Sequence, residues 1–278
     1  MRVVILTNKQ GNQIALANKI AERAEVAAIV FSKNIPRRKP DFSKRAGLFL
    51  SRSAGRIIGR EFVNIWAEMQ KKYDVFYPNL PTENVVEVKN VNDSASVETI
   101  EKHAPDLVVV SGTNLVGKKV IEAAQNGYGI VNLHTGISPY VKGGPNCTNW
   151  CLAKNWFHLI GNTVMWLDLG IDTGNIIATE QTPLDGNETM FDLHWKVMEH
   201  AHEIYVKSIW RIGEGKNVPS VRQKSVAEGN HFNSVDWNAL QMRNALNNFR
   251  HNYKNYFADA ETHRKLSADL ELFPVTDE

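Results

Sequence analysis

Three polar side chains stand at the ends of two apolar segments, where an acyl transfer could be carried out. Residues 130–134 form an apolar run that ends in Asn132 and His134, which share one face of a strand because side chains alternate. A second apolar run, residues 161–167, leads into a turn that contains Asp172. This turn could bring the carboxylate beside the histidine, so that an amide, an imidazole and a carboxylate converge.

These residue types suit the attack of an amine on an acyl carbonyl. The attack creates an oxyanion and leaves a proton on the amine, so the site needs hydrogen-bond donors and a proton acceptor. Asn132 and His134 can donate to the oxyanion, and Asp172 can accept from His134, which favours the charged, donating form of the imidazole. The chemistry requires no metal and no nucleophilic side chain. The sequence leaves open whether His134 or Asp172 finally takes the amine proton.

The elements around these residues alternate between strand and helix. Residues 2–8, 12–24 and 25–31 read as strand, helix and strand, which is a βαβ unit and predicts a parallel sheet. The same order recurs at residues 107–112, 118–125 and 130–134. We therefore predict an α/β fold: a Rossmann-like, mainly parallel sheet with helices on both faces. Further strands are expected at 85–88, 107–112, 130–134, 162–167 and 175–181, and further helices at 97–103, 118–125, 146–155 and 189–210.

Two parts of unequal size are expected. Residues 1–211 read as a catalytic domain, and residues 212–278 read as a small, mainly helical region with helices near 238–249 and 262–270. The turn after the first strand, residues 7–12, holds one glycine, whereas a dinucleotide site uses three so that the backbone can approach a pyrophosphate. The pattern therefore disfavours a dehydrogenase.

Composition sets the class of protein. The chain has 278 residues, 43% of them hydrophobic, and a net charge of +2, which are ordinary globular values that do not suggest a dedicated nucleic-acid binder. No apolar run reads as a signal peptide or approaches the ~20 residues of a membrane-spanning helix, so we expect a cytoplasmic protein. Cys147 and Cys151 read as small buried hydrophobes, because partners at zinc-ligand spacing are missing. No metal is expected.

The segment from residue 37 to residue 60 is strongly basic, with eight Lys and Arg residues against the single acid Asp41. From Lys44 onward the pattern is helical and apolar, so the basic residues would decorate an amphipathic helix or pair of helices. One interpretation is a solvated face on a covering helix. The other is a surface for a phosphorylated substrate or an anionic membrane, since clustered Arg suits phosphate.

The motifs of the central segment resemble those of the formyltransferase family that uses 10-formyltetrahydrofolate. Asn-Leu-His at 132–134 is followed by Pro139 and Gly143, then by a strand and the run Asp-x-Gly-x-Asp-x-Gly at 168–174. The resemblance covers about residues 1–210. It implies that Asn132, His134 and Asp172 are the catalytic set and that a folate is the formyl donor.

The resemblance also implies where the two substrates lie. The folate contacts would be Ser111, Gly112, Thr113, Asn114, Leu115 and Val116, together with Asp168, Leu169, Gly170 and Ile171. The contacts to the amine acceptor would be Asn8, Lys9, Gly11, Ser138, Tyr140, Lys142, Gly143 and Asn146. The chain departs from the family pattern at Gly136, where many members have serine, and in the loop 140–146. The departure does not change the predicted reaction, but it leaves the identity of the amine acceptor undetermined.

Within the family, transfer to methionyl-tRNA goes with a larger C-terminal barrel, a deformylase carries an extra domain ahead of its first strand, and the purine-pathway enzyme lacks the basic insertion. The remaining expectation is a sugar-nucleotide N-formyltransferase, which formylates an amino-deoxysugar for surface polysaccharides. Its partner would be a small-molecule amine rather than nucleic acid. The sequence leaves open whether the protein forms a homodimer. The alternatives are another amine, such as methionyl-tRNA or a small metabolite, and a non-catalytic folate- or nucleotide-binding protein on the same scaffold. His158, His194 and His200 read as structural.

Overall fold

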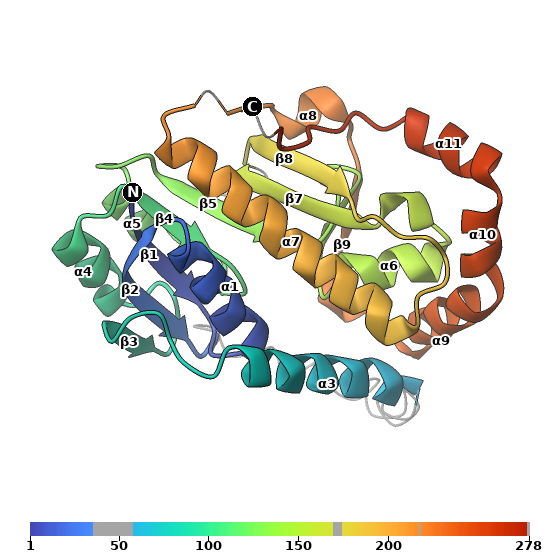
Figure 1. Ribbon diagram of the computed structural model, residues 1–278, viewed down its shortest axis with the longest axis horizontal. Helices are drawn as coiled ribbons and strands as arrows, with labels where there is room; N and C mark the ends of the chain where they lie inside the picture. Colours follow the sequence, from blue (N-terminus) through green and yellow to red (C-terminus); the bar gives the residue numbers. More distant parts are fainter. Residues whose placement is uncertain (36–57, 169–173, 217, 277–278) are drawn as a thin grey trace, which may run out of the picture.

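A seven-stranded sheet organises the protein (Figure 1). The structure is a computed structural model that describes residues 1–35, 58–168, 174–216 and 218–276. The strand order is β3-β2-β1-β4-β5-β7-β8; the first five strands are parallel, while β7 runs antiparallel to both β5 and β8. The predicted α/β class with a mainly parallel sheet is therefore confirmed. The strands are β1 (Arg2–Thr7), β2 (Glu25–Ser32), β3 (Val85–Val88), β4 (Leu107–Val110), β5 (Ile130–His134), β7 (Gly161–Trp166) and β8 (Ile176–Gln181).

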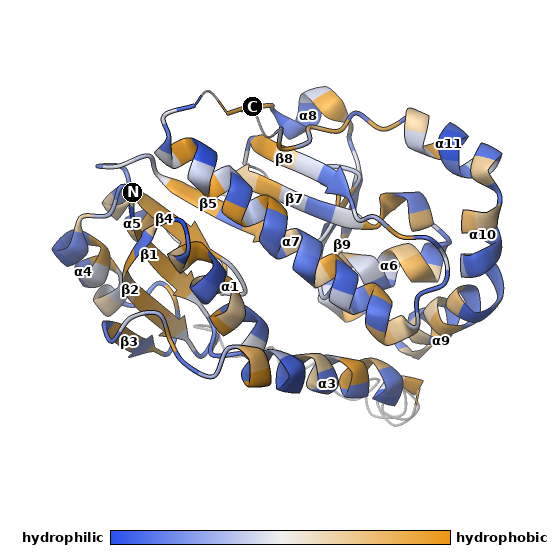
Figure 2. Cartoon of the chain, viewed as in Figure 1, coloured by the Kyte–Doolittle hydropathy of each residue, from blue (hydrophilic) through white to orange (hydrophobic). Residues whose placement is uncertain are grey.

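Helices cover both faces of this sheet. Alternate residues of β1 enter different cores: Val3 and Ile5 pack with α1 and α7, whereas Val4 and Leu6 pack with α4 and α5. Strands buried on both faces read as continuous apolar runs, and Figure 2 shows β1, β2 and β4 mainly hydrophobic, β7 and β8 more mixed, and the helices two-sided. The helices of these layers are α1 (Gly11–Ala21), α3 (Arg60–Phe76), α4 (Ser94–His103), α5 (Lys118–Ala123) and α7 (Met190–Gly213).

Helix α7 is hydrogen-bonded to β4 and β5, the two strands at whose ends the candidate site lies. Its Thr189 N-cap and Asp192 form a reciprocal capping box, which fixes where the helix begins. Near its other end the fully buried Tyr205 hydroxyl accepts a hydrogen bond from the Val110 N–H at 3.1 Å. The same hydroxyl lies 2.9 Å from the carbonyl oxygen of Val110 and 2.8 Å from that of Val131, to which it donates. One phenol therefore ties α7 to β4 and β5.

We expect Tyr205→Phe to lower the free energy of unfolding by about 1–3 kcal/mol, because the substitution leaves buried backbone groups of both strands without their partner. Denaturant unfolding monitored by circular dichroism measures the change. Tyr128→Phe, at a residue that is 52% exposed, is the matched control and should change the stability little. Equal stabilities of the two variants would show that the Tyr205 hydrogen bonds contribute nothing.

Residues after α7 fold back over the end of the sheet that carries β8 (Figure 1). The predicted helices near 238–249 and 262–270 appear as α9 and α11, while the strand β9 and the π-helical turn were not predicted. The division at residue 211 stays a prediction. The elements on this side of the molecule are β6 (Val141–Gly143), α6 (Cys147–Lys154), a 3₁₀ turn (Phe157–Leu159), α8 (Gln223–Val226), β9 (Asn230–Phe232), a second 3₁₀ turn (Ser234–Asp236), α9 (Ala239–Asn248), a π-helical turn (Phe249–Tyr253), α10 (Lys254–Ala258) and α11 (Ala260–Ala268).

This region is anchored to the main body by polar and apolar contacts. The buried Glu188 carboxylate accepts hydrogen bonds from Lys196 at 2.6 Å and from the Tyr253 hydroxyl at 2.8 Å. Burial alone would raise the Glu188 pKa, but these hydrogen bonds outweigh it and lower the pKa to about 2. Trp150 of α6 stacks on Phe232 of β9 with ring centroids 4.3 Å apart.

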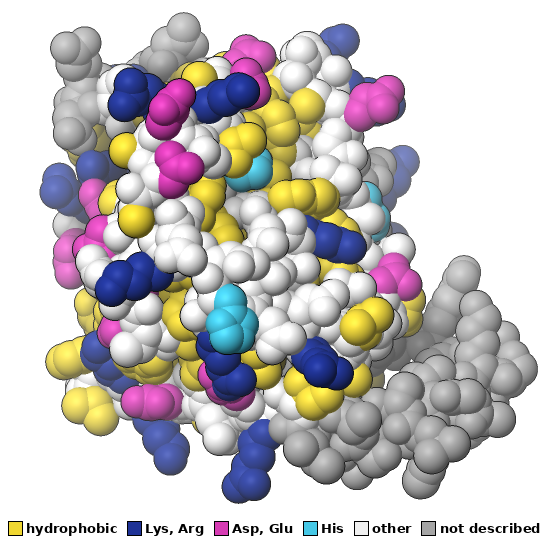
Figure 3. Space-filling model, turned by 90° about the vertical axis from the view of Figure 1, so that its right-hand side faces the viewer, with side chains coloured by type: hydrophobic (Ala, Val, Ile, Leu, Met, Phe, Trp, Pro, Cys, Tyr) yellow, Lys and Arg dark blue, Asp and Glu magenta, His cyan; other side chains and the backbone are white. Residues whose placement is uncertain are grey.

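On the face shown in Figure 3, Lys and Arg side chains are interspersed with Asp and Glu among the residues drawn in colour.

Most of the basic segment 37–60 lies outside the described residues; of its eight basic residues only Arg60, the first residue of α3, is described. Helix α3 packs on the main body through the buried Met69 and Tyr73. The choice between a solvated face and an anion-binding surface therefore stays a prediction. In the described ranges, the helices are all too short or too polar to cross a membrane.

Candidate active site

A cavity of about 300 Å³ opens beyond the carboxyl ends of β4 and β5. Ligands of open α/β sheets bind at this edge, because loops rather than paired strands line it. The cavity contains two of the three predicted catalytic residues and most of the predicted folate contacts that the structure describes. Its lining includes Gly112, Thr113, Asn114, Leu115, Val116, Asn132, His134, Pro145, Trp166, Leu167, Asp168 and Gly174. Ser111 lies next to this loop and is itself buried.

Strand β5 places Asn132 and His134 side by side at the cavity. Their side chains are half-buried, whereas Leu133 between them is buried in the core on the opposite face. The strand is paired on both sides: Val110 of β4 lies opposite Asn132, and Thr163 of β7 lies opposite His134. The shared face that alternation predicts is thus present, on a backbone held by two neighbours.

The turn after His134 is fixed by one buried threonine. The Thr163 hydroxyl donates to the Gly136 carbonyl oxygen at 2.7 Å and accepts from the Ser138 N–H at 2.9 Å. The side chain of Thr163 is fully buried, so water does not compete for these bonds. The direction in which the chain leaves the histidine is therefore set by β7.

Three asparagines hold the loop 111–116 that forms the facing wall. Asn8 and Asn34 both donate to the Gly112 carbonyl oxygen, at 2.8 and 2.9 Å, and Asn34 also accepts from the Asn114 N–H at 2.9 Å. Asn92 donates to the Leu115 carbonyl oxygen at 2.8 Å. Gly112 has φ +69°, and a Cβ there would come within 2.9 Å of the Asn8 amide. The shape of this wall is thus set through backbone groups.

Sequence reasoning had not found Asn34 or Asn92. Each bonds a loop distant in sequence, and only the parallel sheet brings these loops to one edge. Asn34 adopts φ +56°, a left-handed conformation that asparagine tolerates better than most residues. The residues around Asn34 in the sequence do not predict this conformation. Asn8 was predicted to bind the acceptor, and in the structure its amide supports the folate-side loop.

The predicted carboxylate is not described. Leu169, Gly170, Ile171 and Asp172 lie outside the described residues. Both ends of their turn reach the cavity, since Asp168 and Gly174 line it. A Cβ at Gly174 would collide with the Trp166 carbonyl oxygen, so this end of the turn lies tight against β7. The convergence of Asp172 with His134 stays a prediction.

The loop predicted to face the acceptor is built into the structure at several points. The Tyr140 hydroxyl accepts from the Glu271 N–H at 2.9 Å, and the Asn146 side chain caps α6 by accepting from the Asn149 N–H. Gly143 lies in β6 opposite Phe232 of β9, where a Cβ would meet the Phe232 carbonyl oxygen at 2.1 Å. These residues therefore position the loop, and their contact with an acceptor stays a prediction. Lys142 is half-exposed on the same loop, and Ser138 is buried.

The acceptor residues predicted on the first βα turn lie elsewhere. Asn8 and Lys9 line a second hollow, of about 370 Å³, together with residues of β2. There the Lys9 ammonium is 3.0 Å from the Glu87 carboxylate. Gly11 begins α1, and a Cβ there would meet the Gln70 carbonyl oxygen of α3 at 2.6 Å. The structure thus does not gather all the predicted acceptor contacts into one cavity.

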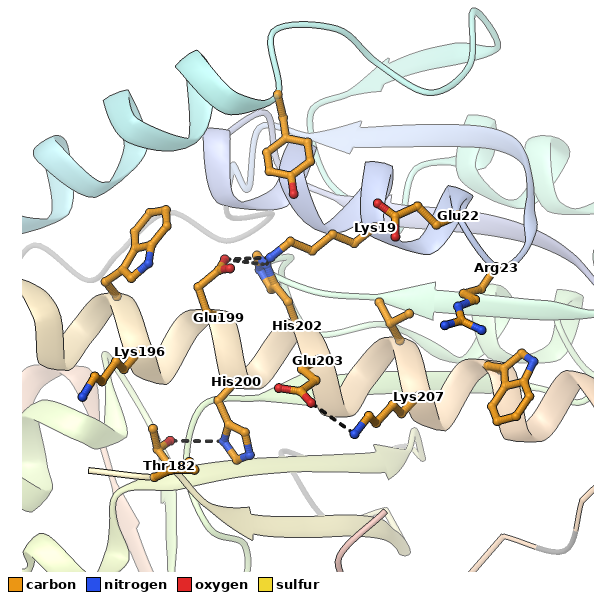
Figure 4. Close-up of a pocket in the computed structure, with 15 residues that line it drawn as sticks. Lys19, Glu22, Arg23, Thr182, Lys196, Glu199, His200, His202, Glu203 and Lys207 are labelled. Atoms are coloured by element: carbon orange, nitrogen blue, oxygen red, sulfur yellow. Dashed lines mark hydrogen bonds and ion pairs between the residues drawn. The ribbon is translucent and has the colours of Figure 1, made fainter. Parts of the chain in front are cut away.

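A larger hollow of about 870 Å³ runs along the outer side of α7 beside α1 (Figure 4). Several of its charged side chains are paired: Lys19 is 2.7 Å from Glu199, Lys207 is 3.1 Å from Glu203, and His200 is hydrogen-bonded to Glu180. The residues predicted for catalysis line the smaller cavity instead. His200 also bonds Thr182, which agrees with the structural role predicted for it. Within the described ranges, no three His, Cys, Asp or Glu residues are grouped to hold a metal.

Comparison with known proteins identifies the family. The model of the formyl transferase family matches residues 1–209, which comprise the whole sheet and the catalytic edge just described. The chain belongs to this family of enzymes. The predicted family and enzyme class are therefore confirmed.

Individual relatives are more distant. The methionyl-tRNA formyltransferase of Clostridium tetani is 32% identical over 119 residues, which are 42% of this chain and 37% of the relative, and that of Clostridium beijerinckii is 29% identical over 156 residues, which are 54% and 49%. The chain thus spans less than half the length of these curated relatives. A sugar N-formyltransferase from a Shewanella species superposes with a TM-score of 0.55 at 14% identity, over 88% of each chain. The glycinamide ribonucleotide transformylase 1 of Symbiobacterium toebii gives 0.51 at 20%, over 80% of this chain and 94% of that one. Identities this low show the fold alone.

Proposed function

We propose that the protein transfers a formyl group from 10-formyltetrahydrofolate to the primary amine of an amino-deoxysugar carried by a nucleotide. The observation that carries the proposal is the cavity in which Asn132 and His134 face the loop 112–116. A pterin presents hydrogen-bonding edges, and this loop offers backbone N–H and C=O groups in a shape that the surrounding asparagines hold fixed. The residues present therefore fit a folate.

Each catalytic side chain has one task in this reaction. The amine forms a bond to the formyl carbon, and the charge that develops on the formyl oxygen is met by the Asn132 amide and the His134 imidazole. As the bond from that carbon to the folate nitrogen breaks, the released nitrogen takes up the proton that the amine loses. One such donor typically contributes about 2.7–4 kcal/mol to the transition state. Asp172 would accept a hydrogen bond from His134 and favour its charged, donating form.

Two findings support a sugar as the acceptor. A solved sugar N-formyltransferase shares the fold over most of its length. Residues 230–232 pair with residues 141–143 in the loop that follows the catalytic strand, so the C-terminal region takes part in holding the predicted acceptor loop. A second candidate is methionyl-tRNA, because the curated relatives carry that activity in their names.

The two candidates can be separated in one assay. The purified protein is incubated with 10-formyltetrahydrofolate and, in separate reactions, with nucleotide-linked amino-deoxysugars, initiator methionyl-tRNA and glycinamide ribonucleotide, and release of tetrahydrofolate is followed. We expect release with an amino sugar only. Release with methionyl-tRNA alone would overturn the sugar assignment and keep formyl transfer, whereas no binding of tetrahydrofolate by calorimetry would overturn both.

A further inference from the structure

A cysteine thiol lies against the ring of the proposed catalytic histidine. The Cys147 Sγ is 3.4 Å from the His134 Nε2 and 3.6 Å from the Gly143 carbonyl oxygen. Cys147 is the first residue of α6 and is 1% exposed. The sequence interpretation of this residue as a small buried hydrophobe accounts for its burial but not for these two polar contacts.

Cys147 has one hydrogen for two neighbouring polar atoms, so it donates to one of them and its sulfur can accept from the other. The Gly143 carbonyl oxygen can only accept; when the Cys147 S–H donates to it, the sulfur is left as an acceptor for His134. A histidine nitrogen that donates must carry a hydrogen, and the partner of one ring nitrogen decides which tautomer is present. In this arrangement the Nε2 of His134 carries a hydrogen, in the neutral ring as in the charged one.

We propose that Cys147 is a positioning residue that holds the His134 ring in place with its Nε2 protonated, ready to donate to the formyl oxygen. This inference rests on the proposed function. Thiol sulfur is a weak acceptor, so the developing oxyanion competes successfully for the hydrogen on Nε2. A carboxylate in the position of the thiol would hold that hydrogen more strongly. Cys147 orients the donor without occupying it strongly.

Gly136 makes room for this contact. A Cβ at position 136 would lie 2.7 Å from the Cys147 Cβ, 2.9 Å from its sulfur and 2.9 Å from the His134 Nε2. All three distances are shorter than real Cβ contacts, and the φ of Gly136 is not in the left-handed region, so space rather than backbone strain requires the glycine. Position 136, where the sequence departs from the family pattern, is thus coupled to Cys147: the thiol occupies the space that a side chain there would take.

The first test compares the two buried cysteines of α6. Cys147→Ala should lower kcat by roughly 10- to 100-fold with little change in KM for 10-formyltetrahydrofolate. The His134 N–H would be misplaced, and it stabilises the transition state rather than the bound folate. Cys147→Ser should restore most of the rate. Cys151→Ala is the matched control: its thiol is equally buried but bonds the Leu159 carbonyl oxygen, so its kcat should equal that of the unchanged protein.

The second test needs no acceptor and so separates this inference from the proposed function. Nitrogen-15 spectra of the imidazoles should show His134 protonated at Nε2 in the unchanged protein and in Cys151→Ala. In Cys147→Ala the hydrogen should redistribute between the two ring nitrogens. Identical His134 signals in Cys147→Ala and Cys151→Ala, or equal kcat values, would overturn the proposal.

Substitutions at position 136 allow a double-mutant cycle between Gly136 and Cys147. Gly136→Ser alone should lower kcat, because its Cβ meets both Cys147 and His134. Combined with Cys147→Ala, the serine has space and a hydroxyl beside the ring, so the double variant should be more active than Gly136→Ser. Additive losses would show that the two positions are independent and would contradict the coupling.

Discussion

Replacing His134 by alanine is expected to lower kcat for formyl transfer by about 10²- to 10³-fold, the loss that follows removal of one oxyanion donor. KM for the folate should change little, since the loop 111–116 is held by Asn8, Asn34 and Asn92 rather than by the histidine. His134 is half-buried at a strand end, and its removal creates no core cavity, so the fold should persist. Steady-state kinetics and a thermal unfolding scan measure the two effects.

His251→Ala supplies the matched control, because His251 is exposed on the far helical region and touches neither wall of the cavity. Its kcat should equal that of the unchanged protein. A His134→Ala variant with normal turnover would refute the assignment of the oxyanion donors to β5. Loss of folding instead of turnover would show that His134 serves the turn after β5 rather than the reaction.

Asp172→Asn is expected to cut turnover by at least an order of magnitude and to leave stability nearly unchanged. The asparagine keeps the size of the side chain but removes the negative charge that favours the charged, donating imidazole. The effect should fall on kcat and on its pH profile rather than on KM, because the charge acts on the transition state. Kinetics across pH 5 to 9 would measure it.

The control for this variant is Asp269→Asn, at an exposed residue of the C-terminal region. It should leave both kcat and its pH profile unchanged. If Asp172→Asn retains normal turnover, Asp172 has been misassigned and the donating form of His134 does not depend on its charge. If its kcat falls without a change in the pH profile, Asp172 acts by shaping the turn 168–174 rather than through its charge.

Local patterns predicted the sheet well because its strands are long apolar runs and its helices have clear stripes. Periodicity of two placed Asn132 and His134 on one face, and the structure has them there. The fold class follows from such patterns within short windows, whereas the family followed from the resemblance of the motifs at 132–134 and 168–174. The short strand β6 was predicted as loop, since its three residues are strand only by virtue of pairing with β9.

What the sequence could not provide are contacts between segments far apart. Asn34 and Asn92 brace the folate-side loop from the ends of other elements, and nothing in their neighbours marks them. Cys147 was recognised as buried, but the pattern could not place its sulfur against an imidazole that precedes it by a turn, a strand and two prolines. Geometry of this kind depends on packing, which single-sequence periodicity does not encode.

The pairing of β6 with β9 also sets an order in time. Residues 141–143 find their strand partner only in residues 230–232, 89 positions later (230 − 141). Chains grow at about 5–20 residues per second, so on a ribosome roughly 4 to 18 seconds separate the emergence of the two strands. The described lining of the cavity of about 300 Å³ ends at Gly174 and so emerges before residue 230. If the loop 140–146 binds the acceptor as proposed, the growing chain has its donor side before its acceptor side is held in place.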